Sequence, residues 1–295
     1  MKASAPGPAA VGGGVVAAGW DAAFDALPRS LFLPELVWAF EAEGHAVAVD
    51  RVEEPLVWRE AAESDQPVIT QWDNGRHRGR APGRTPTSSA SAPPLVAAML
   101  AALDVAPGMR VLEVGTGTGW NAGLLAHRLG QENVTTVEVD ERVARAARRS
   151  LEGVGLHPRV VTGDGALGVP DAAPYDRIIA TCGMRRIPAA WLAQLRPGGV
   201  VLATWGTAFS STDALVRAHR PRGRHGHRAV PVAGGVHEVT RRRRRERRGE
   251  AAPLPAGPPD RRHHQHGLAT GRHLAPVPVR RGTVDAGGRT RGPGP

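Results

Sequence analysis

Cysteine, tyrosine and phenylalanine are scarce in this 295-residue chain, which contains one, one and four of them respectively. The single cysteine, Cys182, excludes a disulfide-linked scaffold and a cysteine-built zinc site, and it is typical of a reducing cytoplasm. No apolar run approaches the roughly 18 residues of a membrane span, so a membrane protein is not expected. Residues 1–19 are broken by glycines and make a poor secretion signal, so we predict a flexible or over-extended start. These absences favour a cytoplasmic location.

The net charge of +10 comes entirely from the C-terminal part of the chain. Residues 218–295 contain 18 arginines, no lysine and five acidic residues, whereas residues 1–217 carry more acidic than basic side chains. The same segment contains three leucines and no Phe, Trp, Tyr, Ile or Met, which is too little apolar surface for a core. We therefore predict residues 218–295 as a disordered, low-complexity tail and place the folded protein before it.

Three interpretations of this tail stay open. The arginines at 241–245, 247 and 248 are typical of an arm that binds nucleic acid, although a charge run is more often a solvated segment. Arg-, Pro- and His-rich text without lysine is also what GC-rich DNA yields when it is translated out of frame. A shift of one nucleotide from Ala218 permits a reading that looks like two strands joined by an Asp-Gly turn. We favour this third interpretation, which the DNA sequence would test.

Short apolar runs alternate with segments of helical spacing between residues 110 and 205. Strands are expected at 110–114, 134–139, 159–162, 175–181 and 200–205, and helices at 120–129, 140–153 and 187–195. This alternation indicates a Rossmann-like, doubly wound, mostly parallel α/β sheet. In such a sheet a ligand binds at the carboxyl ends of the strands. Cys182 follows the fourth strand and is expected to be a core thiol rather than a nucleophile.

The first of these strands ends in a glycine loop. Gly115, Gly117 and Gly119 are spaced G-x-G-x-G, whereas a dinucleotide site prefers G-x-G-x-x-G. Glu138 ends the second strand, where a carboxylate can accept hydrogen bonds from both ribose hydroxyls. Asp164 follows the third strand and can accept a hydrogen bond from an adenine amino group. Each feature is also found in ordinary turns, but together they favour an adenosine ligand without a pyrophosphate.

These motifs resemble the protein-L-isoaspartate O-methyltransferase family of class I S-adenosylmethionine-dependent methyltransferases. The resemblance is carried by VLEVGTGTG at 111–119, Val-Glu at 137–138, GDG at 163–165, APYDRI at 173–178 and LRPGGV at 195–200. Outside the generic fold, ALPRSLFLP at 26–34 and SASAPPLVA at 89–97 are similar to segments of the same family. The resemblance extends over about residues 22–207.

The resemblance implies an enzyme that uses S-adenosyl-L-methionine to methylate the carboxylate of L-isoaspartyl residues in proteins or peptides, which permits repair through a succinimide. It implies that Ser91 is catalytic and that Thr87, Ser88 and Ser89 lie on the substrate side. Ser91 has a structural alternative, because serine before an apolar run that begins with proline is typical of a helix N-cap. No metal is expected, and the cofactor-binding residues implied are Glu113, Gly115, Thr116, Gly117, Gly119, Glu138, Asp164 and Gly165.

Other features depart from the family pattern and keep alternatives open. Residues 70–84 are polar and longer than expected, and they look more like an actinobacterial branch in which some members modify ribosomally made peptides. Aspartate methylation in such a peptide is therefore an alternative function. A nucleic-acid-binding protein that uses the basic tail, which we consider the weaker interpretation, and an inactive frame-shifted remnant are alternatives of other classes.

The expected organisation is one main domain that acts as a monomer. A helical, substrate-side segment is predicted at 20–84 and the S-adenosylmethionine-binding core at 85–217. The family's sheet ends in an antiparallel pair after the fifth strand. In this chain that pair would fall in the arginine-rich tail, where no strand can be read from the sequence.

Overall fold

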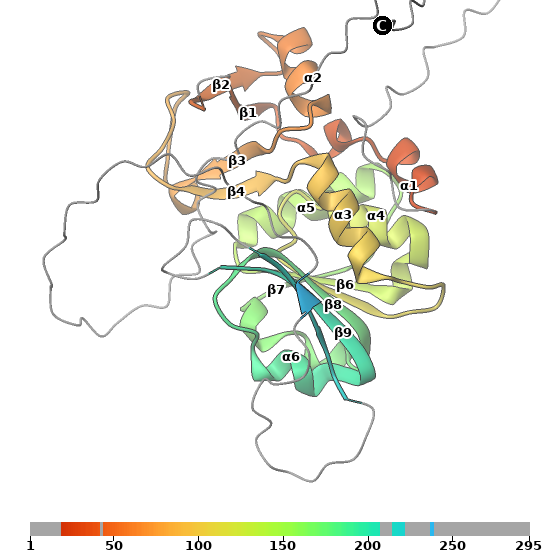
Figure 1. Ribbon diagram of the computed structural model, residues 1–295. Helices are drawn as coiled ribbons and strands as arrows, with labels where there is room; N and C mark the ends of the chain where they lie inside the picture. The colour runs from red at the N-terminus through yellow and green to blue at the C-terminus, as the bar shows by residue number, and fades with distance from the viewer. Residues whose placement is uncertain (1–18, 42–43, 207–213, 222–236, 239–295) are drawn as a thin grey trace, which may run out of the picture.

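The structure is a computed structural model of the chain, and it describes residues 19–41, 44–206, 214–221 and 237–238. The larger of its two sheets (Figure 1) has the strands β5 (Val111–Val114), β6 (Val134–Glu138), β7 (Arg159–Thr162), β8 (Tyr175–Met184), β9 (Leu195–Trp205), β10 (Ala214–His219) and β11 (His237–Glu238). Their order across the sheet is β11-β10-β9-β8-β5-β6-β7. The switch point, where the chain order reverses, lies between β5 and β8, and this is where a doubly wound sheet binds its ligand.

The strands expected from the sequence pair in parallel, as predicted. β5 lies between β6 and β8, β6 pairs with β7, and β8 pairs with β9. β8 and β9 are longer than expected, because β8 continues to Met184 and β9 begins at Leu195. A register shift after Tyr175 allows β9 to pass through its Pro-Gly-Gly sequence without leaving the sheet. The mostly parallel α/β fold is thereby confirmed.

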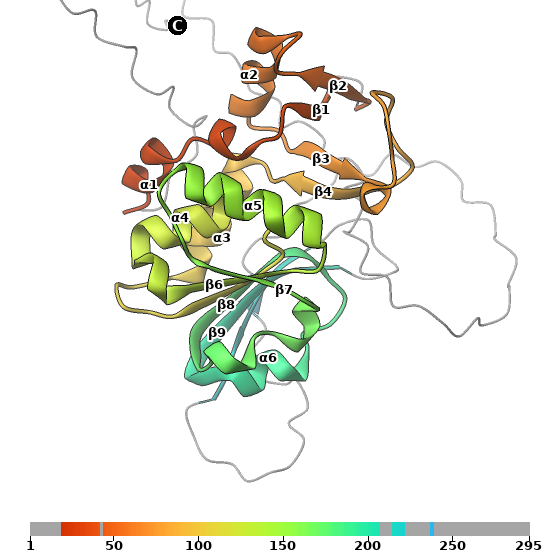
Figure 2. The ribbon, with the colours of Figure 1, turned by 180° about the vertical axis from the view of Figure 1, so that it is seen from behind.

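Helices cover both faces of this sheet, as Figures 1 and 2 show from opposite sides. α3 (Pro93–Leu103), α4 (Trp120–Leu129) and α5 (Glu141–Gly153) lie on one face, and α6 (Ala189–Gln194) lies on the other. α5 begins at an N-cap, because the Asp140 carboxylate accepts hydrogen bonds from the backbone N–H groups of Arg142 and Val143. The doubly wound arrangement follows from this placement of helices.

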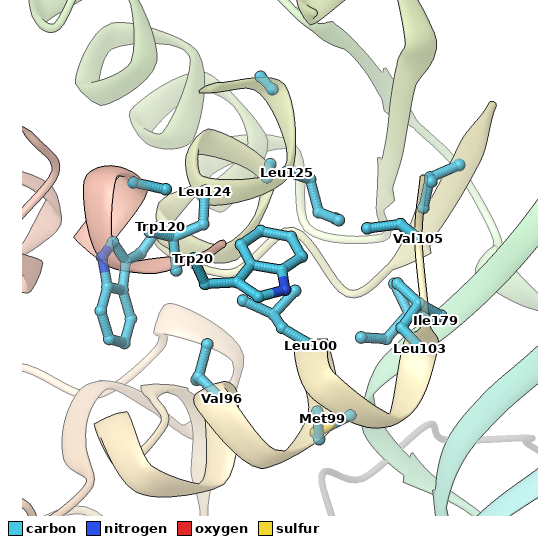
Figure 3. Packing of buried hydrophobic residues seen from close by; sticks show 14 of the residues in the cluster. Trp20, Val96, Met99, Leu100, Leu103, Val105, Trp120, Leu124, Leu125 and Ile179 are labelled. Atoms are coloured by element: carbon cyan, nitrogen blue, oxygen red, sulfur yellow. The ribbon is translucent and has the colours of Figure 1, made fainter. Parts of the chain in front are cut away.

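Alternation along the strands divides the apolar side chains between two cores. On one face, Val111 and Ile179 pack with α3 and α4, and Figure 3 shows the indole rings of Trp20 and Trp120 among the leucines of these helices. On the other face, Leu112 and its neighbours pack with residues of α6. The two cores leave the carboxyl ends of the strands free to form a site.

A second, antiparallel sheet lies beside α3 and α5, above the larger sheet in Figure 1. It contains β1 (Leu36–Phe40), β2 (Ala46–Asp50), β3 (Val68–Trp72) and β4 (Pro86–Ala90), in the order β2-β1-β3-β4. The helix α2 (Pro55–Glu63) packs on this sheet, whereas α1 (Asp21–Ala26) packs against α4 through Phe24 and Trp120. Short 3₁₀ helices complete the described elements at Arg29–Phe32 (η1), Asp73–Gly75 (η2), Gln131–Asn133 (η3), Gly165–Leu167 (η4) and Pro170–Ala172 (η5).

Residues 20–84, which the sequence predicted to be helical, contain three of these four strands, so that expectation is corrected. The strands bury alternate residues on opposite faces: Val37 packs with Trp58 of α2, whereas Trp38 packs edge-on against Trp72. Period-2 burial of this kind stabilises a sheet and is incompatible with a helix. The segment supplies a platform on one side of the site.

The antiparallel strand after the fifth parallel strand is present, contrary to the expectation that no strand could be read from residue 218 onward. β10 pairs with β9 along its whole length and runs through the expected boundary, from Ala214 to His219. Leu215, Val216 and Ala218 are buried there, which explains why the strand continues into the arginine-rich segment. β11 pairs with β10 through Val216 and Arg217. The other residues of the predicted tail, with its arginine run, lie outside the described residues.

Among the described residues, no helix is both long enough and apolar enough to cross a membrane. The cytoplasmic location stays a prediction from the cysteine content.

Candidate active site

A cavity lies at the carboxyl ends of β5, β6 and β8, between the larger sheet and the β3–β4 side of the smaller one. It brings together the substrate-side and cofactor-side residues that the sequence singled out. Gly119 alone of those residues does not line it; this glycine precedes α4, at its N-cap position. The predicted residues along the cavity are Thr87, Ser88, Ser89, Ser91, Glu113, Gly115, Thr116, Gly117, Glu138, Asp164 and Gly165.

The glycine loop adopts a backbone that favours glycine. Gly115 and Gly119 have φ angles of 93° and 90°, in the left-handed region. A Cβ atom at Gly119 would lie 3.2 Å from the backbone oxygen of Ala147 in α5, so a larger residue would push α4 and α5 apart. The loop therefore carries the chain sharply from β5 into α4 and leaves its backbone open to the cavity.

Glu138 lies where the sequence placed it, at the end of β6. Its Oε2 accepts a hydrogen bond from the backbone N–H of Gly117 at 3.0 Å, and its Oε1 accepts one from the N–H of Asp140 at 3.2 Å. These contacts hold the carboxylate against the glycine loop. Each oxygen keeps a further lone pair, so the group can accept hydrogen bonds from ligand hydroxyls as well.

Asp164 and Gly165 form the adjacent wall after β7. Asp164 Oδ1 accepts a hydrogen bond from the N–H of Ala166 at 2.8 Å and starts η4. A Cβ atom at Gly165 would lie 2.5 Å from Cγ1 of Val114, so only glycine fits there without displacement. Val139 and Leu167 flank this wall and are 60% and 64% exposed.

Glu113 is fully buried beneath the glycine loop. Its Oε1 accepts a hydrogen bond from Asn121 Nδ2 at 2.7 Å, and its Oε2 accepts one from Thr136 Oγ1 at 2.6 Å. Burial raises the pKa of this carboxyl to about 7, against the lowering effect of the two hydrogen bonds; the negative charge of Glu138 raises it further. Thr116 is also buried, with its hydroxyl 2.6 Å from that of Thr136.

The hydroxyl groups of β4 and the following turn form the opposite wall. Ser88 is buried and accepts a hydrogen bond from Thr70 Oγ1 at 3.1 Å, so its side chain is engaged within the smaller sheet. Ser91 is half-buried, and its hydroxyl forms no hydrogen bond with another described residue. The N-cap residue of α3 is Ala92, with no side-chain cap, so the structural alternative for Ser91 is not what the fold uses. Ser91 is held instead through its carbonyl oxygen, which accepts from Arg29 Nη1 at 3.0 Å.

Several lining residues were missed by the sequence analysis. Gln71 and Asn74 come from β3 and η2, in the segment noted only as polar and long. Asp140 could have been found as the N-cap that follows Glu138, whereas Thr181 of β8 had no signal in the sequence. Cys182 also lines the cavity. Burial raises the pKa of its thiol to about 11, so the thiol is protonated at neutral pH and is a poor nucleophile.

The charges along this cavity are all negative. Its lining contains the carboxyl groups of Glu113, Glu138, Asp140 and Asp164 and no lysine, arginine or histidine among the described residues. A pyrophosphate would be repelled by such a wall, whereas a ligand with a positive centre would be attracted. Among the described residues, no group of three or more His, Cys, Asp or Glu side chains is arranged to hold a metal ion.

Residues 82–226 match the sequence model of the family protein-L-isoaspartate(D-aspartate) O-methyltransferase. The protein-L-isoaspartate O-methyltransferase of Pyrococcus horikoshii is 44% identical over 118 residues, which make up 40% of this chain and 53% of that protein. The protein of the same name from Thermotoga maritima is 38% identical over 137 residues, covering 46% of this chain and 40% of that one. A solved structure of a protein-L-isoaspartate O-methyltransferase superposes with a TM-score of 0.55 at 27% identity, covering 70% of this chain and 56% of that chain.

Five parallel strands followed by an antiparallel one, with a glycine loop after the first parallel strand and an acidic residue after the second, define the class I methyltransferase fold. This was the class expected from the sequence. Residues 82–226 of the chain are similar to the protein-L-isoaspartate O-methyltransferase family. The chain spans about half the length of the curated relatives that it matches.

Proposed function

We propose that this chain binds S-adenosyl-L-methionine and methylates the carboxylate of L-isoaspartyl residues in proteins or peptides. The observation that carries the cofactor assignment is the charge of the cavity, which is lined by four acidic side chains and no basic one among the described residues. A cofactor with a sulfonium centre is attracted by that wall, and the glycine loop leaves room for its close approach. The similarity of residues 82–226 to the protein-L-isoaspartate O-methyltransferase family supports the acceptor, an isoaspartyl carboxylate.

The residues present suit methyl transfer to a carboxylate. Bound S-adenosyl-L-methionine would supply an electrophilic methyl group. The acceptor carboxylate has a pKa near 4 and is ionised at pH 7, so the site needs no general base. Glu138 and Asp164 would hold the adenosine part, and the hydroxyl of Ser91 would orient the acceptor while the cavity wall excludes water from it.

Titration calorimetry with S-adenosyl-L-methionine tests the cofactor assignment. We expect the full chain to bind it with a dissociation constant on the order of micromolar. Glu138→Ala and Asp164→Ala should each weaken binding by about tenfold to hundredfold, because each removes a charged hydrogen-bond acceptor. Glu138→Gln keeps an acceptor for the N–H of Gly117 and separates loss of the charge from disturbance of the loop.

Glu60→Ala is the matched control, because Glu60 is exposed on α2, away from the cavity. It should bind the cofactor as the unaltered protein does. Absence of binding by the folded, unaltered chain would refute the proposed function and favour an inactive remnant.

The acceptor assignment is tested by the rate of methylation of isoaspartyl peptides. Ser91→Ala should lower kcat/KM by about tenfold to hundredfold, because it removes one donor aimed at the acceptor, while the affinity for the cofactor stays unchanged. Ser150→Ala, which removes an exposed hydroxyl of α5, should leave both quantities unchanged. Matched peptides with aspartyl in place of isoaspartyl complete the panel. If the aspartyl peptide is methylated faster than the isoaspartyl peptide, the proposed role in protein repair is wrong, and modification of an aspartyl peptide takes its place.

A further inference from the structure

Gln71 reaches the cavity from β3, outside the region that matches the family model. Its side chain connects the two walls of the site. Nε2 donates a hydrogen bond to Asp140 Oδ2 at 3.0 Å, and Oε1 accepts one from Thr87 Oγ1 at 2.8 Å. Both polar ends of the amide are therefore used, one on each side of the cavity.

The chemistry of the two partners determines how the amide is oriented. A carboxylate only accepts hydrogen bonds, so the amide nitrogen must face Asp140 and the amide oxygen must face Thr87. Asp140 is ionised at neutral pH: burial on its own would raise its pKa, but hydrogen bonds from Gln71 and from two backbone N–H groups hold that pKa below its usual range. An amide turned the other way would place its oxygen against this carboxylate and lose the contact with Asp140.

The orientation of Gln71 in turn determines what Thr87 can offer. Because it faces an oxygen, the Thr87 hydroxyl must donate its single hydrogen to Gln71, whose backbone oxygen also lies 3.4 Å away. One lone pair of the same hydroxyl accepts from the backbone N–H of Asn74 at 3.0 Å. A hydroxyl has one hydrogen and two lone pairs, so a single acceptor position remains.

We propose that Gln71 is a positioning residue that makes Thr87 an acceptor for a backbone N–H of the peptide substrate. This inference rests on the proposed function and adds to it, because it assigns the peptide backbone to the Thr87 side of the cavity. The substrate carboxylate cannot bind to Thr87, since the hydroxyl has no hydrogen left to donate. That carboxylate is left to Ser91, whose hydroxyl forms no hydrogen bond with the other described residues.

Isoaspartyl peptides that each carry one backbone N-methyl group near the isoaspartyl residue provide the test. With the unaltered protein, one of these peptides should show a KM raised by about tenfold, because its N–H is missing. With Thr87→Val or Gln71→Met, the KM of the parent peptide should rise by a similar factor, and that N-methyl group should cause no further rise. The value of kcat and the affinity for S-adenosyl-L-homocysteine should stay within about twofold, a split that a general loss of structure would not produce.

Gln66→Met is the matched control, because Gln66 is exposed just ahead of β3 and does not line the cavity. It should retain the N-methyl effect of the unaltered protein. The proposal is overturned if no N-methyl group raises the KM of the unaltered protein, or if the same increase persists in Thr87→Val and Gln71→Met. A protein that binds the cofactor but methylates no isoaspartyl peptide would instead refute the proposed acceptor, and this inference with it.

Discussion

Replacing Arg29 by methionine is expected to lower the free energy of unfolding by about 4 kcal/mol, because hydrogen bonds from a charged donor are lost and buried carbonyl groups are left unpaired. The Arg29 side chain is 3% exposed and donates to five backbone oxygens. Two of these belong to Ala61 and Ala62, in the last turn of α2, where a positive charge also interacts favourably with the helix dipole. Burial lowers the pKa of the guanidinium to about 10, so it stays charged at pH 7.

Urea unfolding of the variants measures this effect. Arg29→Lys should recover only part of the loss, since an ammonium group has three donors and lacks the planar fork that reaches five carbonyl groups. Arg51→Met is the matched control: Arg51 pairs with Glu35 at the surface and lies over the ring of Trp58, so its removal should cost at most about 1 kcal/mol. Equal losses for Arg29→Met and Arg51→Met would show that the buried contacts of Arg29 are not important for stability.

Glu113→Gln is expected to make the protein more stable at pH 8 and to remove a pH dependence that the unaltered protein shows between about pH 4.5 and pH 7. The pKa of Glu113 is raised from 4.5 to about 7 in the folded protein, mainly by burial. Below pH 4.5 the carboxyl is protonated in both the folded and the unfolded state, so it causes no change of stability with pH there. As the pH rises from 4.5 towards 7, this carboxyl ionises in the unfolded chain before it ionises in the folded protein, so the free energy of unfolding falls. The fall is complete above pH 7 and amounts to about 3 kcal/mol.

The measurement is the free energy of unfolding at pH 4.5 and at pH 8 for both proteins. The change in the free energy of unfolding between pH 4.5 and pH 8 should be smaller in Glu113→Gln by about 3 kcal/mol, because an amide does not titrate. Glu60→Gln, a substitution of the same kind on the exposed face of α2, should leave the difference unchanged. An unaltered pH dependence in Glu113→Gln would mean that the buried carboxyl is not the group responsible.

The parallel unit could be predicted from the sequence because its signals are local. β7 was predicted to the residue, and α4 begins and ends where the glycines at 119 and 130 indicated. The smaller sheet was missed because β3 pairs with β4 across a long polar connection and with β1 at one recorded position, Trp38 with Ile69. Pairing of this kind depends on contacts between distant residues, which no short window of sequence reveals.

The amino-acid sequence by itself determined the α/β class, the glycine loop and the carboxylates at the ends of β6 and β7. These features rest on strand periodicity, on backbone angles that favour glycine, and on residues a fixed distance along the chain from a strand end. Only the tertiary structure decided which side chains complete the site. Gln71 meets Asp140 from 69 residues away, and Arg29 holds Ser91 from 62 residues away. Neither contact has a local pattern, because Gln71 meets Asp140 only when the smaller sheet packs against the larger unit, and Arg29 meets Ser91 only when η1 packs beside α2 and the end of β4.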